Sequence, residues 1–391
     1  MNVLEGYRVV ELAAWVAGPA AGGILADWGA DVVKVEPPAG DPQRRIFGAL
    51  GFADQAGVPP FELDNRGKRS VVLDLATDDG RAAMDVLLAT ADVFLTNVRV
   101  EPLTRMGLDP DAVVARFPKL VYAHVSGYGL EGPDAGRPGY DIGAFWARSG
   151  IAHTLVPPGE PPPGSVAAIG DHTTAITITS GILAKLLERG RTGTGGLVAT
   201  SLLRTGIYCL GWDVGVHLRF GKRARTRART EQPQPLINSY QAGDGKGFWL
   251  IGLEGDRHWP GLLAAFGDDV AGADGLASDE RFVSARTRAT NREALIAALD
   301  ALFAARPFAD WTTRFDAQDV WWAPVNSIPD VIADPQATAA GAFVNMTPRP
   351  DEAPYRAVAT PVDFGGQHLA PGPVPAVGEH TDEILRELGL R

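Results

Sequence analysis

The sequence predicts an α/β protein whose main domain is a doubly wound parallel sheet, and three observations support this fold class. Runs rich in Val and other β-forming residues alternate with longer runs of small or amphipathic helix formers through residues 7–129. Strand–helix–strand units of this kind pair in parallel with a right-handed crossover. The length of 391 residues leaves room for two or three folding units, at roughly 150 residues per domain, with a large buried core.

The predicted elements follow the chain in order. The stretches "YRVVELA", "GPAAGGILADWGA" and "DVVKVEP" predict strand, helix and strand, because a β-rich run gives way to small helix formers and then to a second β-branched run. Further strands are expected at residues 70–75, 92–98 and 120–129, with helical segments at 77–91 and 108–118. This alternation predicts a sheet that helices cover on both faces.

The remainder of the chain changes character twice. Residues 157–163 are too rich in proline for a helix or a central strand, so they predict a surface excursion before a helix at 173–190. Residues 191–203 predict a turn and the start of another strand or helix. Beyond Gly221 a basic and then proline-rich stretch predicts a linker, which a smaller α+β unit from Asn238 to Ile328 and a C-terminal tail follow.

The composition excludes several classes of function. A net charge of −11 disfavours binding to nucleic acid or to an anionic membrane surface, because both need a dense basic face. Cys209 is the only cysteine, which excludes an intrachain disulfide and a cysteine zinc site and fits a reducing compartment. There is no run of about 18 apolar residues, and charged residues interrupt the region where a signal peptide would be apolar. We therefore expect a cytoplasmic protein.

Asp171 is the main candidate for chemistry. In "AAIGDHTTAIT" it follows an apolar run and a glycine at the predicted start of a helix. One interpretation is structural, since Asp is a favoured N-cap that accepts backbone N–H groups. The other is catalytic, since a helix N-terminus helps to keep a carboxylate ionised and competent to attack an activated acyl group. His172 points in a different direction from its neighbour, and we expect a structural or supporting role for it.

Other catalytic patterns are missing from the sequence. The seven histidines contain no HExxH pair, so neither zinc nor iron is expected, and there is no GxSxG elbow. Cys209 lies in the apolar "GIYCLGW", which predicts a buried and inert thiol. The glycines of "VAGPAAGG" lack the GxGxxG spacing, and Pro19 has no N–H to offer a phosphate, which argues against a dinucleotide loop.

Basic residues occur in two settings. The first is a run beyond Gly221 that predicts a solvated linker or a contact with an acidic partner surface: Lys222, Arg223, Arg225, Arg227 and Arg229. The second is a set of separate residues near predicted strand ends, which are either phosphate ligands or ordinary surface cations: Arg44, Arg45, Arg66, Lys68, Arg69, Arg99 and Arg105.

Several motifs in order along the chain carry a family resemblance. They are "GYRVVELAAWVAGPAAGGILADWGADVVKVEPPAGDPQR", "NRGKRSVVLDL", "ADVFLTNVRVEPLTRMGL", "LVYAHVSGYG", "IGDHTTAITITSGILAKLLERGRTGTGG", "APVNSIPDVIADPQATAAGAFV" and "GEHTDEILRELGL". Together the motifs cover nearly the whole chain. The chain resembles the class III (CaiB/BaiF-type) CoA-transferase family, with formyl-CoA transferase and carnitine CoA-transferase among its members and α-methylacyl-CoA racemase as a related branch.

This resemblance implies an architecture. It implies a large Rossmann-like CoA-binding domain built from both ends of the chain, a smaller domain between them, and two such open rings interlocked as a homodimer. The expected division is residues 1–220 for the first part of the large domain, 221–237 for the linker, 238–328 for the small domain and 329–391 for the return to the large domain.

The resemblance also implies a reaction. Asp171 would attack an acyl-CoA thioester, pass through a mixed anhydride and an aspartyl-CoA thioester, and hand CoA to a carboxylic acid. No tightly bound cofactor and no metal are implied, because CoA enters as part of the substrate. The implied CoA contacts are Trp15, Val16, Ala17, Leu73, Ala76, Asn97, Val98 and Arg105.

Three departures from the family pattern affect the expected site. Pro37 replaces a basic residue that several relatives carry after the second strand, with Arg44 or Arg45 as substitutes for that phosphate contact. Tyr140 stands where the racemase branch has a catalytic histidine, and a tyrosine is a poor base near neutral pH, which favours a transferase. The segment "RTEQPQPLIN" has no glycine, which argues against the lid of formyl-CoA transferase and against formyl or oxalate specificity.

Two alternatives to a transferase stay open, an acyl-CoA racemase or epimerase that uses Asp171 with another base, and a non-catalytic CoA-binding protein. Around the substrate, Tyr140 and Asp141 are weaker candidates for the pocket. The stretch "FWARSG", residues 145–150, either borders the acyl pocket or packs in the core.

Overall fold

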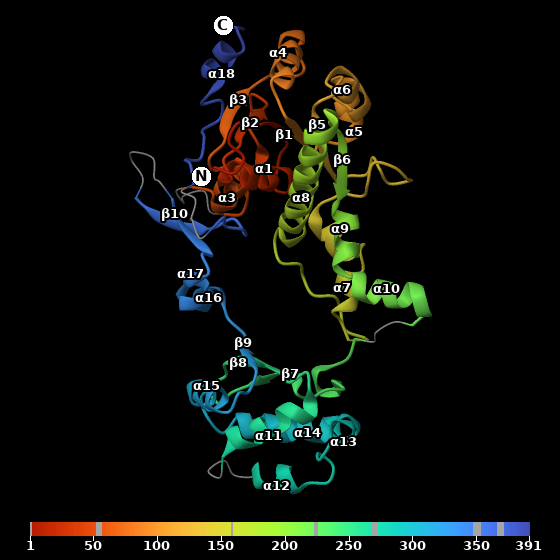
Figure 1. The fold of residues 1–391 in the computed structure, drawn as a ribbon, viewed down its shortest axis with the longest axis vertical. Helices are drawn as coiled ribbons and strands as arrows, with labels where there is room; N and C mark the ends of the chain where they lie inside the picture. The colour runs from red at the N-terminus through yellow and green to blue at the C-terminus, as the bar shows by residue number, and fades with distance from the viewer. Residues whose placement is uncertain are drawn as a thin grey trace. The chain divides into compact units, whose positions relative to one another are not determined.

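The computed structural model describes residues 2–51, 57–157, 159–222, 226–267, 273–346, 353–365 and 371–391 (Figure 1). The chain forms two compact units, which are described separately. The first comprises Met1–Thr154, Pro162–Ala224 and Thr338–Arg391, and the second comprises Leu155–Pro161 and Arg225–Ala337. The domain boundaries expected from the sequence stay a prediction, and Arg223 and Arg225 of the basic run lie outside the described residues.

The first unit contains a six-stranded parallel sheet in the order β3-β2-β1-β4-β5-β6. This is the strand order of doubly wound dinucleotide-binding folds, so the predicted α/β class and parallel sheet are confirmed. The strands are β1 (Arg8–Leu12), β2 (Asp31–Glu36), β3 (Arg69–Val72), β4 (Val93–Thr96), β5 (Val121–Ser126) and β6 (Gly196–Ser201).

Helices cover both faces of this sheet, because the strand side chains are apolar on both sides. On one face, Val9, Val32 and Val93 pack with α1 and α8, and on the other, Val10, Val33 and Phe94 pack with α4, α5, α6 and α18. The helices of this unit are α1 (Ala17–Asp27), α2 (Ile46–Ala49), α3 (Pro59–Asn65), α4 (Asp78–Ala89), α5 (Val100–Arg105), α6 (Pro110–Arg116), α7 (Ile151–Thr154), α8 (Ile169–Thr192), α9 (Leu202–Cys209), α10 (Gly211–Phe220) and α18 (Thr381–Glu387), with the 3₁₀ helix η1 (Pro42–Arg45) and the π-helical η2 (Ile142–Ala147).

The C-terminal segment packs on the edge of the parallel sheet. The backbone N–H of Val72 donates to Thr381 Oγ1 at 3.0 Å, the N–H of His380 donates to the carbonyl of Ser70 at 2.9 Å, and Ile384 is buried against β3 and its neighbours. Before this contact, β10 (Phe343–Met346) and β11 (Tyr355–Val358) form an antiparallel pair. Residues far apart in the sequence therefore complete one unit.

The second unit is built on a three-stranded antiparallel sheet in the order β7-β8-β9. Its core is aromatic: Phe248 of β8 packs against Phe303 and Phe315, and Trp311 donates its indole N–H to the carbonyl of Phe303 at 2.9 Å. The elements are β7 (Ile237–Gln241), β8 (Gly247–Ile251), β9 (Trp322–Pro324), η3 (Arg229–Glu231), α11 (Gly255–Phe266), α12 (Ala273–Ser278), α13 (Ala285–Thr290), α14 (Arg292–Phe303), α15 (Phe308–Ala317) and α16 (Ile328–Ala333), with α17 (Pro335–Ala339) at the boundary.

The expectation for Cys209 is wrong, because this residue is exposed at the end of α9. The apolar sequence around it does not build a core within the chain: Tyr208 and Trp212 are both 85% exposed, and no residue of α10 is buried. Within the residues that the structure describes, no helix is both long and apolar enough to cross a membrane.

Candidate functional site

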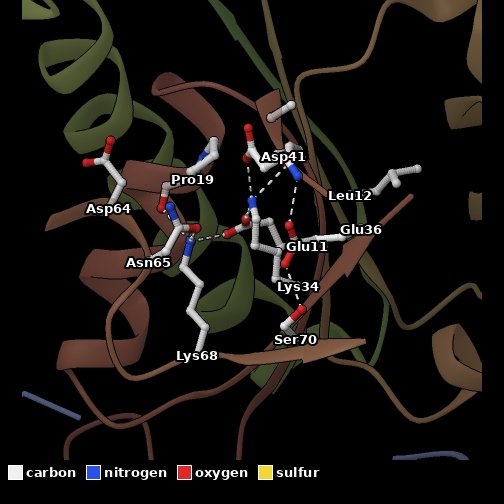
Figure 2. Close-up of polar contacts among 12 residues, drawn as sticks. Glu11, Leu12, Pro19, Lys34, Glu36, Asp41, Asp64, Asn65, Lys68 and Ser70 are labelled. Atoms are coloured by element: carbon white, nitrogen blue, oxygen red, sulfur yellow. Dashed lines mark hydrogen bonds and ion pairs between the residues drawn. The ribbon is translucent and has the colours of Figure 1, made fainter. Parts of the chain in front are cut away.

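A cluster of buried charges lies at the carboxyl end of the central strands (Figure 2). Lys34 of β2 contacts Glu11 of β1 and Asp41, each at 2.9 Å, and Lys68 contacts the other oxygen of Glu11 at 2.7 Å. Glu11 and Lys34 are register partners in neighbouring strands, so their side chains emerge on the same face. We call Glu11, Lys34, Asp41 and Lys68 the buried ion-pair cluster.

The charges in this cluster compensate one another. Burial lowers the pKa of Lys34, but the Glu11 and Asp41 carboxylates outweigh burial and hold the pKa above its usual range. Lys68 has less compensation, so burial and the neighbouring Lys34 charge lower its pKa to about 8 against the effect of Glu11. Since an unpaired buried charge is costly, each member depends on the others.

The cluster holds the loop between β1 and α1. Asp41 Oδ1 accepts hydrogen bonds from the backbone N–H of Trp15 at 3.2 Å and of Gln43 at 2.9 Å. Trp15 has φ of 66°, a left-handed conformation that a non-glycine residue adopts only when its surroundings impose it. Asn97 supports the same loop from β4, because its side chain bonds both the carbonyl and the N–H of Ala14.

The glycines of α1 serve close packing of this helix. A Cβ on Gly22 would meet the carboxylate of Glu11, and one on Gly23 would lie 2.7 Å from the carbonyl oxygen of Asp64. Neither position leaves room for an alanine without movement. Two glycines of the "VAGPAAGG" stretch therefore allow α1 to pack closely against the buried ion-pair cluster and α3.

Asp171 lies in the first turn of α8, but it is not the N-cap. The helix starts at Ile169, and its N-cap is Ala168 with φ of 60°, so the predicted capping role of Asp171 is wrong by three positions. No described residue donates a hydrogen bond to its carboxylate. Burial raises the pKa of Asp171 to about 7, and Asp141 and Asp64 add to this while His172 opposes it. The sequence predicted that the helix N-terminus helps to keep this carboxylate ionised, but burial and the two neighbouring carboxylates outweigh that effect and raise its pKa.

His172 and Asp64 form an ion pair beside Asp171. His172 Nε2 lies 3.1 Å from Asp64 Oδ1, and Gln43 Nε2 donates to Asp64 Oδ2 at 3.3 Å. The hydrogen bond to Asp64 is the main cause that raises the pKa of His172 above its usual range, and burial opposes it.

Tyr140 and Asp141 adjoin the same region. The Tyr140 side chain is 63% exposed, and its ring meets Trp15 edge to face with 6.1 Å between the centroids. Asp141 caps the first turn of η2 by accepting from the N–H of Ile142 at 2.7 Å, while its Oδ2 atom is buried without a partner among the described residues. Tyr140 therefore contacts Trp15, and the next residue, Asp141, acts electrostatically on Asp171.

Phe145 favours the core interpretation of "FWARSG". It belongs to a hydrophobic cluster with Ala144, Ile151 and Leu202, and its ring lies 2.5 Å from where a Cβ of Gly170 would stand. Phe145 therefore packs closely against the first turn of α8, which carries Asp171.

The remaining expected CoA contacts lie on other segments of the same unit. Val16 and Ala17 begin α1, Val98 follows β4, and Leu73 and Ala76 follow β3, with Leu73 buried and Ala76 exposed. Arg105 ends α5 and is 65% exposed in a 3.0 Å ion pair with Glu101.

Most of the separate basic residues are engaged within the chain. Arg44 pairs with Glu36 at 2.6 Å and lies over the Phe61 ring, and Arg45 donates to the carbonyl of Ala39. Arg66 and Arg69 pair with Asp27 and Asp31, each at 2.7 Å, and Lys68 belongs to the buried ion-pair cluster. Arg99 and Arg105 stay exposed. The ligand interpretation is therefore wrong for Arg66 and Lys68, which are buried in structural pairs.

Sequence reasoning missed the residues that surround Asp171 and Trp15, chiefly Asp64, Gln43 and Asp41. A signal was present for the cluster, because Glu11 and Lys34 interrupt apolar strand runs near their carboxyl ends. Asp64 carries no comparable signal, since its partner is 108 residues away. The described residues contain no group of three side chains suited to hold a metal ion.

A family model, similar proteins and a similar crystal structure all indicate the same family. The model described as CoA-transferase family III matches residues 4–381. The chain is 30% identical to the (R)-2-hydroxy-4-methylpentanoate CoA-transferase of Clostridioides difficile, over 99% of this chain and 96% of that protein. It is 31% identical to the cinnamoyl-CoA:phenyllactate CoA-transferase of Clostridium sporogenes, over 99% and 94%. A crystal structure of a CAIB/BAIF family protein from Brucella suis superposes with a TM-score of 0.85 at 31% identity, over 98% and 99% of the two chains.

Proposed function

The chain belongs to CoA-transferase family III and is an acyl-CoA:carboxylate CoA-transferase, and from this premise we propose that Asp171 is its nucleophile. The observation that carries the proposal is that the Asp171 carboxylate is poorly solvated. It is partly buried in the first turn of α8, receives no hydrogen bond from a described residue, and faces the negative charges of Asp141 and Asp64. A carboxylate with so little solvation is a stronger nucleophile than one in water.

The first half of the reaction moves the acyl group and then CoA onto the enzyme. An Asp171 oxygen attacks the thioester carbonyl of the donor, the C–S bond breaks, and CoA leaves as a thiolate from a mixed anhydride. The thiolate then attacks the Asp171 carbonyl carbon. The C–O bond of the anhydride breaks, which releases the donor acid as a carboxylate and leaves an aspartyl-CoA thioester.

The second half repeats these steps in reverse with the acceptor. Its carboxylate attacks the aspartyl thioester, CoA thiolate leaves, and a new mixed anhydride forms. Attack of the thiolate on the acceptor carbonyl gives the new acyl-CoA and regenerates the Asp171 carboxylate. Neither half takes up a proton or water, so the free energy of the thioester is conserved as long as water is excluded.

CoA is proposed to lie along the carboxyl ends of β1, β3 and β4, the edge where open α/β sheets bind ligands. Trp15, Val16, Ala17, Asn97 and Val98 border the β1–α1 loop and β4, and Leu73 and Ala76 follow β3. Arg105 is suited to a nucleotide phosphate, because an exposed pair such as Arg105–Glu101 contributes at most about 1 kcal/mol and exchanges readily.

The active enzyme is proposed to be a cytoplasmic, interlocked homodimer. The support is an apolar surface on α9 and α10 that a single chain leaves exposed, with Tyr208, Trp212, Leu218 and Phe220 as its large side chains. Exposed apolar surface of this kind marks protein interaction sites.

Intact-protein mass spectrometry tests the role of Asp171. Incubation with cinnamoyl-CoA and no acceptor should give a covalent adduct of the acyl group or of CoA, and Asp171→Asn and Asp171→Ala should give none. Asp111→Asn is the matched control, because Asp111 is an exposed acid in the first turn of α6. An adduct that persists in Asp171→Asn would contradict the proposal.

The same incubation in deuterium oxide separates the racemase alternative. A 2-methylacyl-CoA that gains deuterium at its α-carbon without any protein adduct would indicate a racemase. Acceptors for the full reaction are sought first among phenyllactate and (R)-2-hydroxy-4-methylpentanoate, and then among straight-chain and dicarboxylic acids. A CoA-binding protein without activity would show neither adduct nor exchange.

A further inference from the structure

The Asp64–His172 ion pair is a feature that the proposed reaction does not use. His172 is the residue after Asp171 on α8, and its partner Asp64 lies on α3. The Asp64 side chain is 2% exposed and is held from a second side by Gln43, whereas the His172 side chain is 42% exposed. The imidazole therefore connects a fixed, buried carboxylate with the accessible side of the site.

The charges that face His172 are negative. Asp64 faces it from α3, Asp141 from the start of η2, and Asp171 from α8 itself. Lys68 interacts electrostatically with Asp64. Among the described residues, His172 is in turn the positive group that acts on Asp171, which otherwise faces burial and the carboxylates of Asp141 and Asp64.

We propose that the Asp64–His172 pair is a positioning element of the active site: Asp64 fixes a protonated His172 beside Asp171, and this charge keeps the Asp171 carboxylate ionised for its attack on the thioester. The inference rests on the proposed role of Asp171. His172 needs no contact with the substrate, since its effect passes through the neighbouring carboxylate.

This coupling is reciprocal, which makes it measurable from either partner. If protonated His172 lowers the pKa of Asp171, then ionised Asp171 raises the pKa of His172 by the same amount. The pKa of His172 can be measured without substrate. This measurement therefore tests the coupling between His172 and Asp171 even if the proposed reaction is wrong.

Histidine titration by NMR provides the first test. The full-length protein is labelled with ¹³C at histidine Cε1, and the resonance that disappears in His172→Gln is followed against pH. The pKa of His172 should fall by about half a pH unit or more in Asp64→Asn and, independently, in Asp171→Asn. An unchanged pKa in Asp171→Asn would overturn the coupling, and an unchanged pKa in Asp64→Asn would overturn the role of Asp64. Should Asp64→Asn unfold, Asp171→Asn still decides.

The pH dependence of enzyme acylation provides the second test. Cinnamate release from cinnamoyl-CoA in a single turnover without an acceptor should rise with pH as Asp171 ionises. In His172→Gln this rise should move about half a pH unit or more to higher pH, with the plateau rate kept, because Asp171 is ionised at high pH in both proteins. Ile176→Gln, at an exposed position of α8, should leave the midpoint unchanged.

The outcomes separate the two proposals. A lower plateau with an unmoved midpoint in His172→Gln would mean that His172 is only structural, and would overturn the inference. If the wild-type protein released no donor acid from any acyl-CoA and formed no adduct, the proposed role of Asp171 would fail, while the histidine titrations would still report on the Asp64–His172 pair.

Discussion

The proposed role of Asp171 needs two properties that oppose each other. The carboxylate must be poorly solvated to be reactive, and it must be ionised to attack. Burial and the nearby carboxylates of Asp141 and Asp64 raise its pKa to about 7, so the carboxyl group of the proposed nucleophile is only partly ionised at neutral pH. An ordinary aspartate would be fully ionised there, but it would also be fully solvated. In this site a smaller fraction of the Asp171 carboxyl group is ionised, but the ionised form is poorly solvated.

The raised pKa of Asp171 predicts that Asp171→Asn changes the free energy of unfolding. The folded protein binds the Asp171 proton up to a pH of about 7, whereas the unfolded chain loses it near the ordinary value of 3.8. The free energy of unfolding therefore falls as pH rises between these values. Asp171→Asn should be more stable than wild type by roughly 1–3 kcal/mol at pH 8, and the difference should vanish towards pH 4. Urea unfolding at both pH values checks this; equal differences at pH 4 and pH 8 would contradict it.

Gly170 gives a second prediction at the residue scale. A Cβ there would stand 2.5 Å from the Phe145 ring, so Gly170→Ala should destabilise the protein by about 1–3 kcal/mol and displace the first turn of α8. Gly190→Ala in the same helix meets nothing within 4 Å and should be stabilising by about 0.5–1 kcal/mol. Thermal unfolding of both variants measures the contrast. A stable Gly170→Ala protein would show that Phe145 is free to move aside.

At the scale of elements, the buried ion-pair cluster links β1, β2, the loop before η1 and the β1–α1 loop. Lys34 contacts Glu11, Asp41 and the carbonyl oxygen of Ala13, and Asp41 in turn bonds Trp15. Apolar residues of equal size would stabilise a core at least as well. We infer that the cluster determines the path of the β1–α1 loop.

Replacing the central cation tests this inference. Lys34→Met should cost about 3–5 kcal/mol, because it leaves Glu11 and Asp41 buried with less compensation. Lys185→Met, which removes a partly exposed pair with Glu188, should cost less than about 1 kcal/mol. Chemical denaturation gives both values. A change of similar size in the two variants would show that the cluster is not energetically special.

At the scale of the whole molecule, the chain builds one unit from its two ends and a second unit from the segment between them. The residues of the candidate site all belong to the first unit. The apolar surface of α9 and α10 is left exposed by a single chain, which supports the proposed homodimer.

The homodimer predicts a response to charge on this surface. Trp212→Glu combined with Leu218→Glu should shift the protein from dimer to monomer in light scattering coupled to size exclusion, because burying two carboxylates in an apolar interface is unfavourable. Leu187→Glu, at an exposed position of α8, serves as the control. A double variant that stays dimeric would place the interface elsewhere.

Local sequence patterns were sufficient for the fold class. Strand and helix periodicity predicted the alternation from β1 to β5, since the strands are apolar on both faces and the helices carry their own start signals, such as Asp109 before α6. The thiol of Cys209 and the N-cap role of Asp171 were predicted wrongly. In both cases the local context was clear, but the apolar surface around Cys209 stayed exposed and the N-cap of α8 lies three residues before Asp171.

The sequence by itself determined the α/β class, the reaction family and the choice of Asp171 as the candidate nucleophile. Only the tertiary structure decided the pKa of Asp171, because a pKa depends on which charges lie nearby in space. Asp64, Asp141 and Gln43 come from segments well removed from Asp171 along the chain. Asp171 lies at the start of a helix, as the sequence suggested, but its pKa depends on burial, on the distant carboxylates of Asp141 and Asp64, and on the neighbouring His172.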